Sequence, residues 1–306
     1  MTLRIGLIGC GNWGRYILRD LLSLGVAVDV VTRSAETRAQ ALAQGASIAV
    51  EQIDALGTAQ AGYVVATPSS THAGVVTALL ATGRPIFVEK PLTTDVGSAR
   101  RLVAAAPERI FVMDKWRYHS GVEALAAMAR SGEFGEILGV RTYRLGWGHP
   151  HADADASWIL MPHDLSIALE ILGFLPAPRS AWSPFPGRAA SDMIGVLADA
   201  DGPKVTMEIA TSQPISRRSV VVVGSRRSAQ FGDSYDTRLT IVDGTPDGKY
   251  GAPYERTIGN DMPLLRELRV FVEHLRGGPP PRSSAAEGAL IVERIAALRS
   301  MAGLTD

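Results

Sequence analysis

The sequence predicts an α/β protein with two domains: a doubly wound parallel sheet, then an α+β domain with a large, mainly antiparallel sheet. Three observations support this. Short apolar runs alternate with helical patterns in the first part of the chain, which is typical of a parallel sheet covered on both faces. Later strands alternate apolar and polar residues, which favours antiparallel pairing. The length of 306 residues suits two domains.

The elements of the first domain, 1–118, follow one another regularly. Each strand is short and apolar, and most helices end at a glycine. The predicted strands are 3–8, 26–31, 63–66, 85–88 and 110–113, and the predicted helices are 12–24, 35–44, 73–82 and 94–106.

The second domain, 119–306, is predicted to bind substrate and to mediate oligomerisation. It begins with a helix at 122–130, a strand at 137–145 and a helix within 164–172. From residue 191 onward, stretches such as KVTMEIAT alternate with period two. Two helices close the chain. The first carries a stripe of Leu264, Leu268, Phe271 and Leu275, and the second begins with a capping-box pattern at Ser284 and Glu287.

Composition narrows the possible functions. The 31 Lys and Arg residues equal the 31 Asp and Glu residues, so charge gives no reason to expect nucleic acid or an anionic membrane as partner. A single cysteine, Cys10, excludes an intrachain disulfide and a cysteine-rich metal site. No apolar run approaches the roughly 18 residues of a membrane span, and no signal peptide is evident. We therefore expect a soluble, cytoplasmic protein.

A glycine-rich turn follows the first strand. Gly9-Cys10-Gly11-Asn12-Trp13-Gly14 fits G-x-G-x-x-G and opens a helix, the context in which this pattern predicts dinucleotide binding. The first glycine allows the turn, the second lets backbone approach a pyrophosphate, and the third lets the helix pack on the strand. The helix N-terminus would hold the phosphates. An ordinary strand–helix turn is the alternative, and Cys10 is expected to be a packing residue.

The end of the second strand predicts the cofactor. NAD sites usually carry an acid there for the ribose 2′-hydroxyl, but this strand ends in Thr32-Arg33-Ser34. Arg33 can pair with a 2′-phosphate, and the two hydroxyls can add hydrogen bonds. The sequence therefore favours NADP over NAD. Alternatively, Arg33 is an exposed loop residue and Ser34 caps the next helix.

Two further strand ends carry polar residues where the crevice of a doubly wound sheet is expected. Thr67-Pro68 follows one strand and Glu89-Lys90-Pro91 follows the next. A lysine beside a carboxylate and near nicotinamide can hydrogen-bond to a substrate oxygen, although such a pair is often a surface ion pair. We interpret His72 as structural at the start of its helix, with a cofactor contact as the alternative.

These motifs together resemble the glucose–fructose oxidoreductase, inositol dehydrogenase and rhizopine-catabolism (Gfo/Idh/MocA) family. The resemblance runs over nearly the whole chain. It comprises the turn at 9–14, ATPSSTH at 66–72, EKP at 89–91, ARSGEFGEILGV at 129–140 and MPHDLSIALEILG at 161–173. It implies a Rossmann domain, a nicotinamide cofactor and a homodimer or homotetramer.

The resemblance also implies two catalytic residues. By position, Lys90 reaches the nicotinamide ribose and the substrate, and His163 matches the family's acid/base. Without the resemblance, His163 reads as a packed or capping residue. Asp164 is equally consistent with a helix N-cap and with a direct catalytic role.

Further residues are candidates for the substrate mouth. Aromatic faces pack on sugar C–H surfaces, although a tryptophan is more often core. His149 and His151 show metal-like spacing, but no third ligand is apparent, so we expect no metal and place them in a loop at the mouth. The remaining candidates are Trp116, Arg117, Trp147 and Trp158.

The sequence departs from the family at one position. The family often carries an aspartate four residues before the histidine, and this chain has Ile159 there. Asp153, Asp155 or Asp164 are possible substitutes, and we expect Asp155 or a backbone carbonyl to orient His163.

The predicted function is an NADP-preferring oxidoreductase acting on a sugar, polyol or related ketone. His163 would exchange the hydroxyl proton, and Lys90 would stabilise the developing alkoxide. Two alternatives remain: a hydrolase or lyase that recycles bound dinucleotide, and a catalytically silent NADP-binding sensor, for which Ile159 is the motivating feature.

Overall fold

The computed structural model describes residues 2–148, 153–185, 192–245 and 247–304. The chain forms two compact units. Unit 1 comprises residues 1–115 with 262–292, and unit 2 comprises residues 116–261 with 293–306. The first crossover lies close to the expected boundary at 118. Residues 262–292, however, pack in unit 1, whereas a division into 1–118 and 119–306 places them in the second domain.

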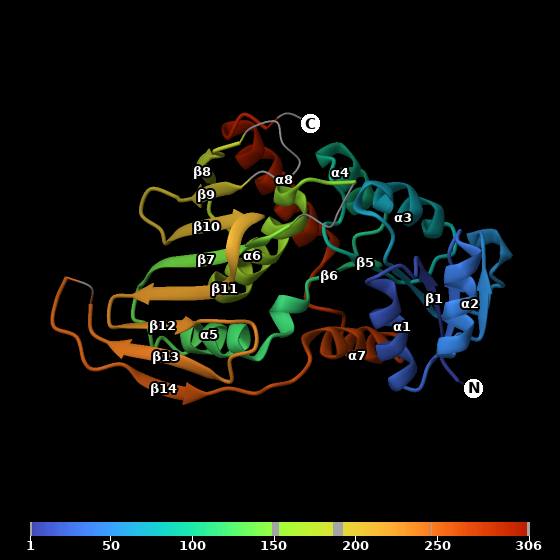
Figure 1. Cartoon of the computed structure of the whole chain (residues 1–306), viewed down its shortest axis with the longest axis horizontal. Helices are drawn as coiled ribbons and strands as arrows, with labels where there is room; N and C mark the ends of the chain where they lie inside the picture. Colours follow the sequence, from blue (N-terminus) through green and yellow to red (C-terminus); the bar gives the residue numbers. More distant parts are fainter. Residues whose placement is uncertain (1, 149–152, 186–191, 246, 305–306) are drawn as a thin grey trace. The chain divides into compact units, whose positions relative to one another are not determined.

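Unit 1 is built on a six-stranded parallel sheet with strand order β3-β2-β1-β4-β5-β6 (Figure 1). This is the order of a Rossmann fold, as predicted. Strands β2 and β3 are added on one side of β1, and strands β4 to β6 on the other. The crevice of such a sheet lies at the carboxyl ends of β1 and β4, where the order of strand addition reverses. The strands are β1 (Arg4–Ile8), β2 (Ala27–Val31), β3 (Ile48–Val50), β4 (Gly62–Val65), β5 (Ile86–Glu89) and β6 (Ile110–Met113).

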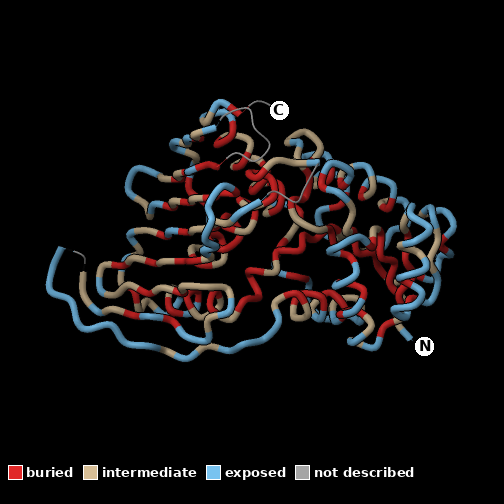
Figure 2. The backbone as a smooth tube through the Cα atoms, in the orientation of Figure 1, coloured by how far each residue is buried: buried red, intermediate tan, exposed pale blue. Residues whose placement is uncertain are grey.

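The helices of unit 1 largely match their predicted ranges. β3 was absent from the predicted elements, because a strand of three partly exposed residues gives almost no pattern. Most residues of the central strands are buried (Figure 2), as expected for a sheet covered on both faces. The helices are α1 (Gly14–Ser23), α2 (Ala35–Gln44), α3 (His72–Leu80), α4 (Val96–Ala105) and α7 (Pro263–Leu275), with short turns η1 (Ile53–Ala55) and η2 (Ser69–Thr71).

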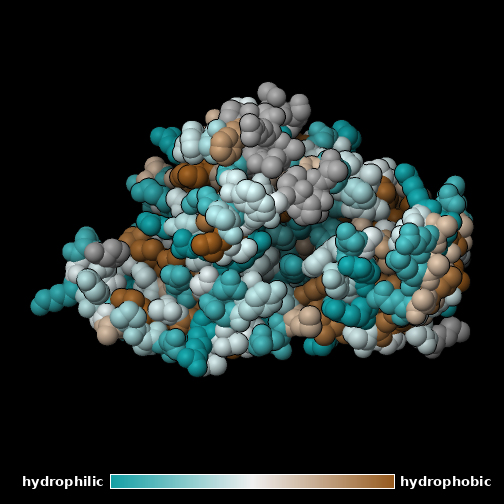
Figure 3. Space-filling view, in the orientation of Figure 1, coloured by the Kyte–Doolittle hydropathy of each residue, from teal (hydrophilic) through white to brown (hydrophobic). Residues whose placement is uncertain are grey.

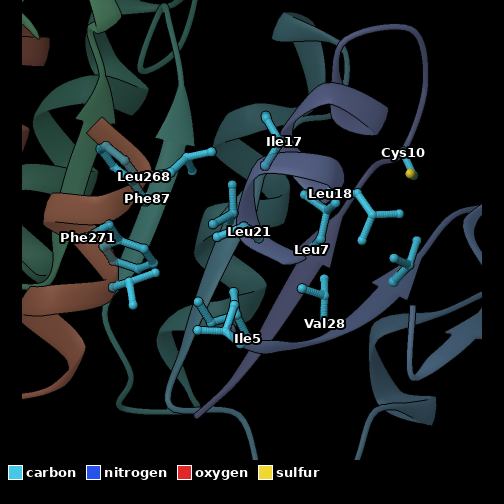
Figure 4. Close-up of a cluster of buried hydrophobic side chains, with 14 of the residues drawn as sticks. Ile5, Leu7, Cys10, Ile17, Leu18, Leu21, Val28, Phe87, Leu268 and Phe271 are labelled. Atoms are coloured by element: carbon cyan, nitrogen blue, oxygen red, sulfur yellow. The ribbon is translucent and has the colours of Figure 1, made fainter. Parts of the chain in front are cut away.

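Helix α7 completes the core of unit 1, although it comes from the far end of the chain. The predicted stripe on α7 packs against α1 and the sheet (Figure 4). The rings of Phe271 and Phe87 are stacked with centroids 4.9 Å apart. Burying such a pair stabilises the fold by roughly 1.5–3 kcal/mol per side chain. Unit 1 therefore depends on residues that follow the whole sheet of unit 2 in sequence.

Unit 2 contains an eight-stranded sheet with order β14-β13-β12-β11-β7-β10-β9-β8. It is mainly antiparallel, as predicted, with one parallel pair between β7 and β10. The strands are β7 (Ile137–Trp147), β8 (Pro178–Trp182), β9 (Met193–Leu197), β10 (Lys204–Ala210), β11 (Ser212–Gly224), β12 (Arg227–Phe231), β13 (Arg238–Asp243) and β14 (Tyr254–Thr257).

Helices α5 (Ser120–Arg130) and α6 (Ala156–Leu172) pack together against this sheet. α6 begins eight residues before the predicted helix, because Asp155 caps it by accepting hydrogen bonds from the N–H groups of Ser157 and Trp158. Pro162 lies inside the helix, where proline usually marks a boundary. Asp164 lies inside this helix, so the N-cap role, one of the two considered for it, is wrong.

The chain ends in α8 (Ala285–Met301), whose residues divide between the two units. The capping box is confirmed. The N–H of Glu287 donates to the Ser284 hydroxyl at 3.2 Å, and the N–H of Ser284 donates to the Glu287 carboxylate at 2.8 Å. Among the described helices, none is long and apolar enough to cross a bilayer.

Candidate active site

The glycine-rich turn after β1 has the geometry expected of a phosphate-binding loop. Gly9 has φ of +92°, and a Cβ there would lie 2.5 Å from the carbonyl oxygen of Ala66. A Cβ on Gly14 would lie 2.5 Å from the carbonyl oxygen of Gly9. Gly11 is exposed, and a Cβ would meet nothing within 4 Å. The first and third glycines are thus required for packing, while the second faces open space.

The N-terminus of α1 offers donors for an anion. Its N-cap residue, Trp13, makes no side-chain capping hydrogen bond, and the first turn contains no acid. By contrast, Ser34 caps α2 and Asp95 caps α4 in the same unit. A helix N-terminus without a side-chain cap leaves its N–H groups and positive dipole end for a ligand. Together with the open space at Gly11, this fits a dinucleotide pyrophosphate.

The end of β2 places Thr32 and Arg33 beside that turn in the sheet order. The Arg33 side chain is exposed, while Ser34 accepts a hydrogen bond from the Thr37 N–H at 3.2 Å. The capping role considered for Ser34 is therefore confirmed. Arg38 donates to the carbonyl oxygens of Thr32 and Arg33 at 2.9 and 2.7 Å. A second guanidinium thus shapes the loop in which a 2′-phosphate is expected.

His72 connects the loops that follow β4 and β5. It is 1% exposed, and its two ring nitrogens lie 2.8 Å from the carbonyl oxygen of Pro91 and 3.0 Å from that of Thr67. The Thr67 hydroxyl accepts from Thr71 at 2.8 Å, within the turn that begins at Pro68. His72 therefore holds two predicted cofactor-binding segments together from inside the protein.

Glu89 and Lys90 at the end of β5 belong to a charged cluster. The indole N–H of Trp13 donates to the Glu89 carboxylate, which also accepts from the Lys90 backbone N–H at 3.1 Å. Lys115 places its ammonium 4.3 Å from the centroid of the Trp13 ring. Burial raises the pKa of Glu89, while Lys90 and Lys115 oppose the shift. The cluster links the glycine-rich turn to the EKP segment.

A carboxyl group of α7 lies behind this cluster. Glu267 is 0% exposed, and neither of its oxygens has a hydrogen-bond partner among the described residues. It stands one helical turn before Phe271, which stacks on Phe87 of β5. Burial raises the pKa of Glu267 well above its ordinary value, and the charges of Glu89 and Asp114 add to this. Burial among these acidic groups therefore favours the uncharged form of Glu267 in the folded protein.

This burial predicts a pH-dependent cost to stability. The folded-state pKa lies above the unfolded value of about 4.3, so the native state holds a proton that the unfolded state releases. The stability of wild type should fall, relative to Glu267→Gln, from about pH 5 upward, by up to about 1.4 kcal/mol per pH unit. Urea unfolding at several pH values measures this. Glu273→Gln, on an exposed position of α7, is the control. Parallel stability curves for wild type and Glu267→Gln would contradict the prediction.

In unit 2, His163 lies on α6 beside an aromatic group. Its ring contacts Trp116 edge-on, with centroids 6.4 Å apart. Trp116 in turn stacks on His119, which stacks on Phe231 of β12. His119 also accepts a hydrogen bond from the Gly121 N–H at 3.1 Å and thereby caps α5. The indole facing His163 is therefore fixed by two elements of the unit.

Asp164, the next residue, points into the sheet. Its carboxylate accepts from Nε and Nη2 of Arg144 on β7 at 3.2–3.3 Å, and both side chains are buried. Burial raises the pKa of Asp164, and Arg144 opposes the shift. The Arg144 guanidinium lies 4.6 Å from the Trp116 ring centroid. Asp164 therefore holds the arginine that supports the wall beside His163.

Asp155 does not orient His163, contrary to expectation. It lies at the start of the same helix, about 12 Å along the axis from residue 163. Its carboxylate is occupied by the capping hydrogen bonds and by Arg299. Ile159 is buried one turn before His163. An isoleucine side chain offers no hydrogen bond, so Ile159 does not replace the family's aspartate as a partner of the imidazole.

The other predicted substrate residues are dispersed. Arg117 is buried and paired with Glu170 at 2.8 Å. Trp158 is 4% exposed, with Arg299 over its ring. Trp147 is 76% exposed at the end of β7. His149 and His151 lie outside the described residues.

Sequence reasoning missed four residues that complete these clusters: Arg38, Lys115, Arg144 and Glu267. Only Arg38 could have been found from its local sequence. It stands four residues after the helix cap Ser34, and this spacing of one helical turn places its side chain near the loop at 32–34. The others reach their partners through pairings between distant segments.

The fold and the glycine-rich turn are typical of a dinucleotide-binding protein, and comparisons with known proteins show which proteins the chain is similar to. Residues 3–113 match the GFO_IDH_MocA model, described as an oxidoreductase family with an NAD-binding Rossmann fold. The first part of the chain is thus similar to the Gfo/Idh/MocA family that the sequence motifs resemble.

Two curated relatives are named as dehydrogenases. UDP-N-acetylglucosamine 3-dehydrogenase from Acidithiobacillus ferrooxidans is 30% identical over 178 residues, which cover 57% of this chain and 56% of that protein. Inositol 2-dehydrogenase 2 from Mycolicibacterium vanbaalenii is 27% identical over 296 residues, covering 90% and 85%. The crystallised UDP-N-acetylglucosamine 3-dehydrogenase from A. ferrooxidans shares the fold with a TM-score of 0.85 at 21% identity, covering 99% of this chain and 98% of that chain.

Proposed function

We propose that this protein is an NADP-preferring dehydrogenase that transfers hydride between nicotinamide and a carbinol or carbonyl carbon of a sugar, polyol or related keto substrate. The observation that carries the proposal is the uncapped N-terminus of α1 behind an open Gly11, with Lys90 held at the next strand ends. The named relatives act on polyhydroxylated compounds, which supports the substrate class.

In this proposal, nicotinamide supplies the hydride acceptor or donor at its C4 atom. Unit 1 binds the dinucleotide through Gly9–Gly14, the segment 32–34, and the loops at Thr67-Pro68 and Glu89-Lys90, with His72 positioning these two loops. His163 takes the hydroxyl proton in oxidation and returns it in reduction. Lys90 stabilises the charge that develops on the substrate oxygen.

Turnover tests the proposal directly. The protein is incubated with NAD or NADP and a broad panel of sugars and polyols, or with NADH or NADPH and a panel of ketones. Formation or consumption of reduced nicotinamide is followed by absorbance at about 340 nm. Net reduction with one substrate class supports a dehydrogenase. Turnover without net absorbance change would instead support hydrolase or lyase chemistry. Cofactor binding with no turnover would support a sensor, which Ile159 beside His163 favours.

Arg33→Ala tests the cofactor preference. A charge-assisted contact to a 2′-phosphate contributes roughly 1.5–3 kcal/mol, which is about ten- to a hundredfold in affinity. We expect Arg33→Ala to weaken NADP(H) binding by that factor and to change NAD(H) binding little, as measured by fluorescence titration. Equal weakening of both cofactors would mean that Arg33 only stacks on adenine.

We further propose that the protein is cytoplasmic and forms a homodimer or homotetramer through the open face of the unit 2 sheet. Trp182, Ile194 and Ile215 on these strands are exposed, and apolar patches interrupt the polar surface in Figure 3. A face of this kind on a large sheet suits self-association. Light scattering after size-exclusion chromatography measures the assembly, and a monomeric mass would refute it.

A further inference from the structure

Two arginines stand opposite one another on adjacent strands of unit 2. Arg144 of β7 and Arg218 of β11 are paired in the ladder. Opposite residues in such a pair have Cβ atoms about 4.5–5.5 Å apart, and like charges there repel. Both lie on the face that α6 covers. On β7, Arg144 shares the buried side with Val140 and Thr142, and on β11, Arg218 shares it with Val220 and Val222.

Of this pair of arginines, only Arg144 binds a carboxylate among the described residues. Asp164 of α6 binds Arg144 through two nitrogens, as described above. Among the described residues, the hydrogen-bond partners of Arg218 are the carbonyl oxygens of Leu145, at 2.8 Å, and Arg217, at 3.5 Å. A carbonyl oxygen satisfies an N–H but does not balance the charge. The pair therefore carries one positive charge more than Asp164 neutralises.

No other charged side chain among the described residues forms an ion pair that neutralises the remaining positive charge of Arg218. Burial lowers the pKa of Arg218, the charge of Arg144 adds to this, and the more distant Asp164, Asp233 and Tyr235 oppose it. Asp233 forms no ion pair with Arg218 in the described part of the chain. Its carboxylate instead accepts hydrogen bonds from the Tyr235 N–H at 3.1 Å and the Ser234 hydroxyl. Partial burial of a cation without a carboxylate partner costs free energy, and a bound anion would reduce that cost.

Arg218 is connected to the catalytic candidate of this unit through two neighbouring side chains, Arg144 and Asp164. His163 and Asp164 are consecutive on α6, Asp164 holds Arg144, and Arg218 is the cross-strand neighbour of Arg144. The ladder between β7 and β11 is irregular immediately before Arg217. Such bulges occur preferentially beside active sites, where they redirect side chains.

We propose that Arg218 binds an anionic substituent of the substrate, a carboxylate or a phosphate several bonds from the reacting carbinol. The inference rests on the proposed function and narrows its substrate class to acidic or phosphorylated sugars and polyols. A guanidinium suits either group, because it can donate two parallel hydrogen bonds to a planar carboxylate or to phosphate oxygens.

Matched pairs of neutral and anionic compounds test the inference. The probes are glucose with glucuronate and glucose 6-phosphate, galactose with galacturonate, and inositol with inositol phosphate. Their affinity is measured by calorimetry on the protein saturated with reduced cofactor, and their turnover by absorbance. Glucuronate and galacturonate report on carboxylate, and the phosphates report on phosphate.

Two variants of adjacent residues are compared. Arg218→Gln removes the proposed anion contact. Arg217→Gln is the control, because Arg217 lies on the opposite face with its guanidinium 3.9 Å from the Tyr143 ring centroid. We expect wild type to bind at least one anionic member more tightly than its neutral parent. Arg218→Gln should weaken that member about ten- to a hundredfold, in Kd and KM rather than kcat, with neutral compounds unaffected.

The outcomes separate the two proposals. Anion binding that depends on Arg218 without any hydride transfer supports the anion site and refutes the dehydrogenase function. Turnover of neutral sugars with no preference for any anionic partner supports the function and overturns the anion site. Equal losses for neutral and anionic compounds in Arg218→Gln, with a lowered melting temperature, would show that Arg218 only ties β11 to β7.

Discussion

Replacing His163 with asparagine is expected to lower kcat by about 10²–10⁴-fold while leaving NADP(H) affinity unchanged. Asparagine keeps a polar side chain of similar length but cannot exchange a proton near neutral pH, so general acid–base catalysis is lost. The dinucleotide-binding elements belong to unit 1, and His163 belongs to unit 2. Steady-state kinetics and fluorescence titration with NADPH measure the two effects separately.

Tyr143→Phe is the matched control for this variant. Tyr143 lies on the opposite face of β7 from Arg144, under the guanidinium of Arg217, so its hydroxyl should not affect turnover. Wild-type kcat together with a wild-type pH profile in His163→Asn would assign His163 a structural role. The alternative acid/base candidates would be Lys90, Tyr143 and His149. Because Tyr143 lies on the opposite face of β7 from Arg144, the search would begin with Lys90 and His149.

Lys90→Ala is expected to lower kcat by about two decades or more, with a smaller change in cofactor affinity. An ammonium that stabilises a developing alkoxide acts mainly in the transition state. The structure supports a fixed backbone here, because the Lys90 N–H donates to Glu89, which also binds Trp13 of the glycine-rich turn.

Lys90→Arg distinguishes charge from geometry. Arginine keeps the positive charge but presents a planar fork instead of a compact ammonium. Partial recovery of kcat relative to Lys90→Ala would indicate electrostatic stabilisation, and no recovery would indicate that hydrogen-bond geometry dominates. Near-normal kcat in Lys90→Ala would remove Lys90 from the mechanism.

Much of the fold was predictable because its signals are local. Buried parallel strands read as short apolar runs, Gly45 ends α2 in a left-handed conformation, and Ser284 with Glu287 marks the start of α8. α6 was misread because Pro162 and Asp164 resemble a helix start, while the cap at Asp155 lies upstream. The packing of α7 in unit 1 was not predictable. The apolar periodicity of α7 shows that Phe271 is buried, but not that Phe87 of unit 1 is its partner.

The candidate site also has parts that the sequence predicts and parts that it does not. A motif located the glycine-rich turn and the EKP segment. The hydrogen-bond partners of the site residues were not predictable. Trp13 donates to Glu89, which lies 76 residues away in sequence, and Arg144 of a strand donates to Asp164 of a helix. A single sequence shows which side chains carry charge, but the pairing of those charges depends on strand register.

The position of α7 fixes when the protein can fold during synthesis. N-terminal domains generally fold first as a chain leaves the ribosome. Here the nascent Rossmann segment lacks Leu268, Phe271 and Val272 until nearly the whole polypeptide has emerged. The apolar groove beside Phe87 and Leu21 is therefore open while the strands of unit 2 are being made. The unit that is translated first can therefore be completed only after all the strands of unit 2 have been translated.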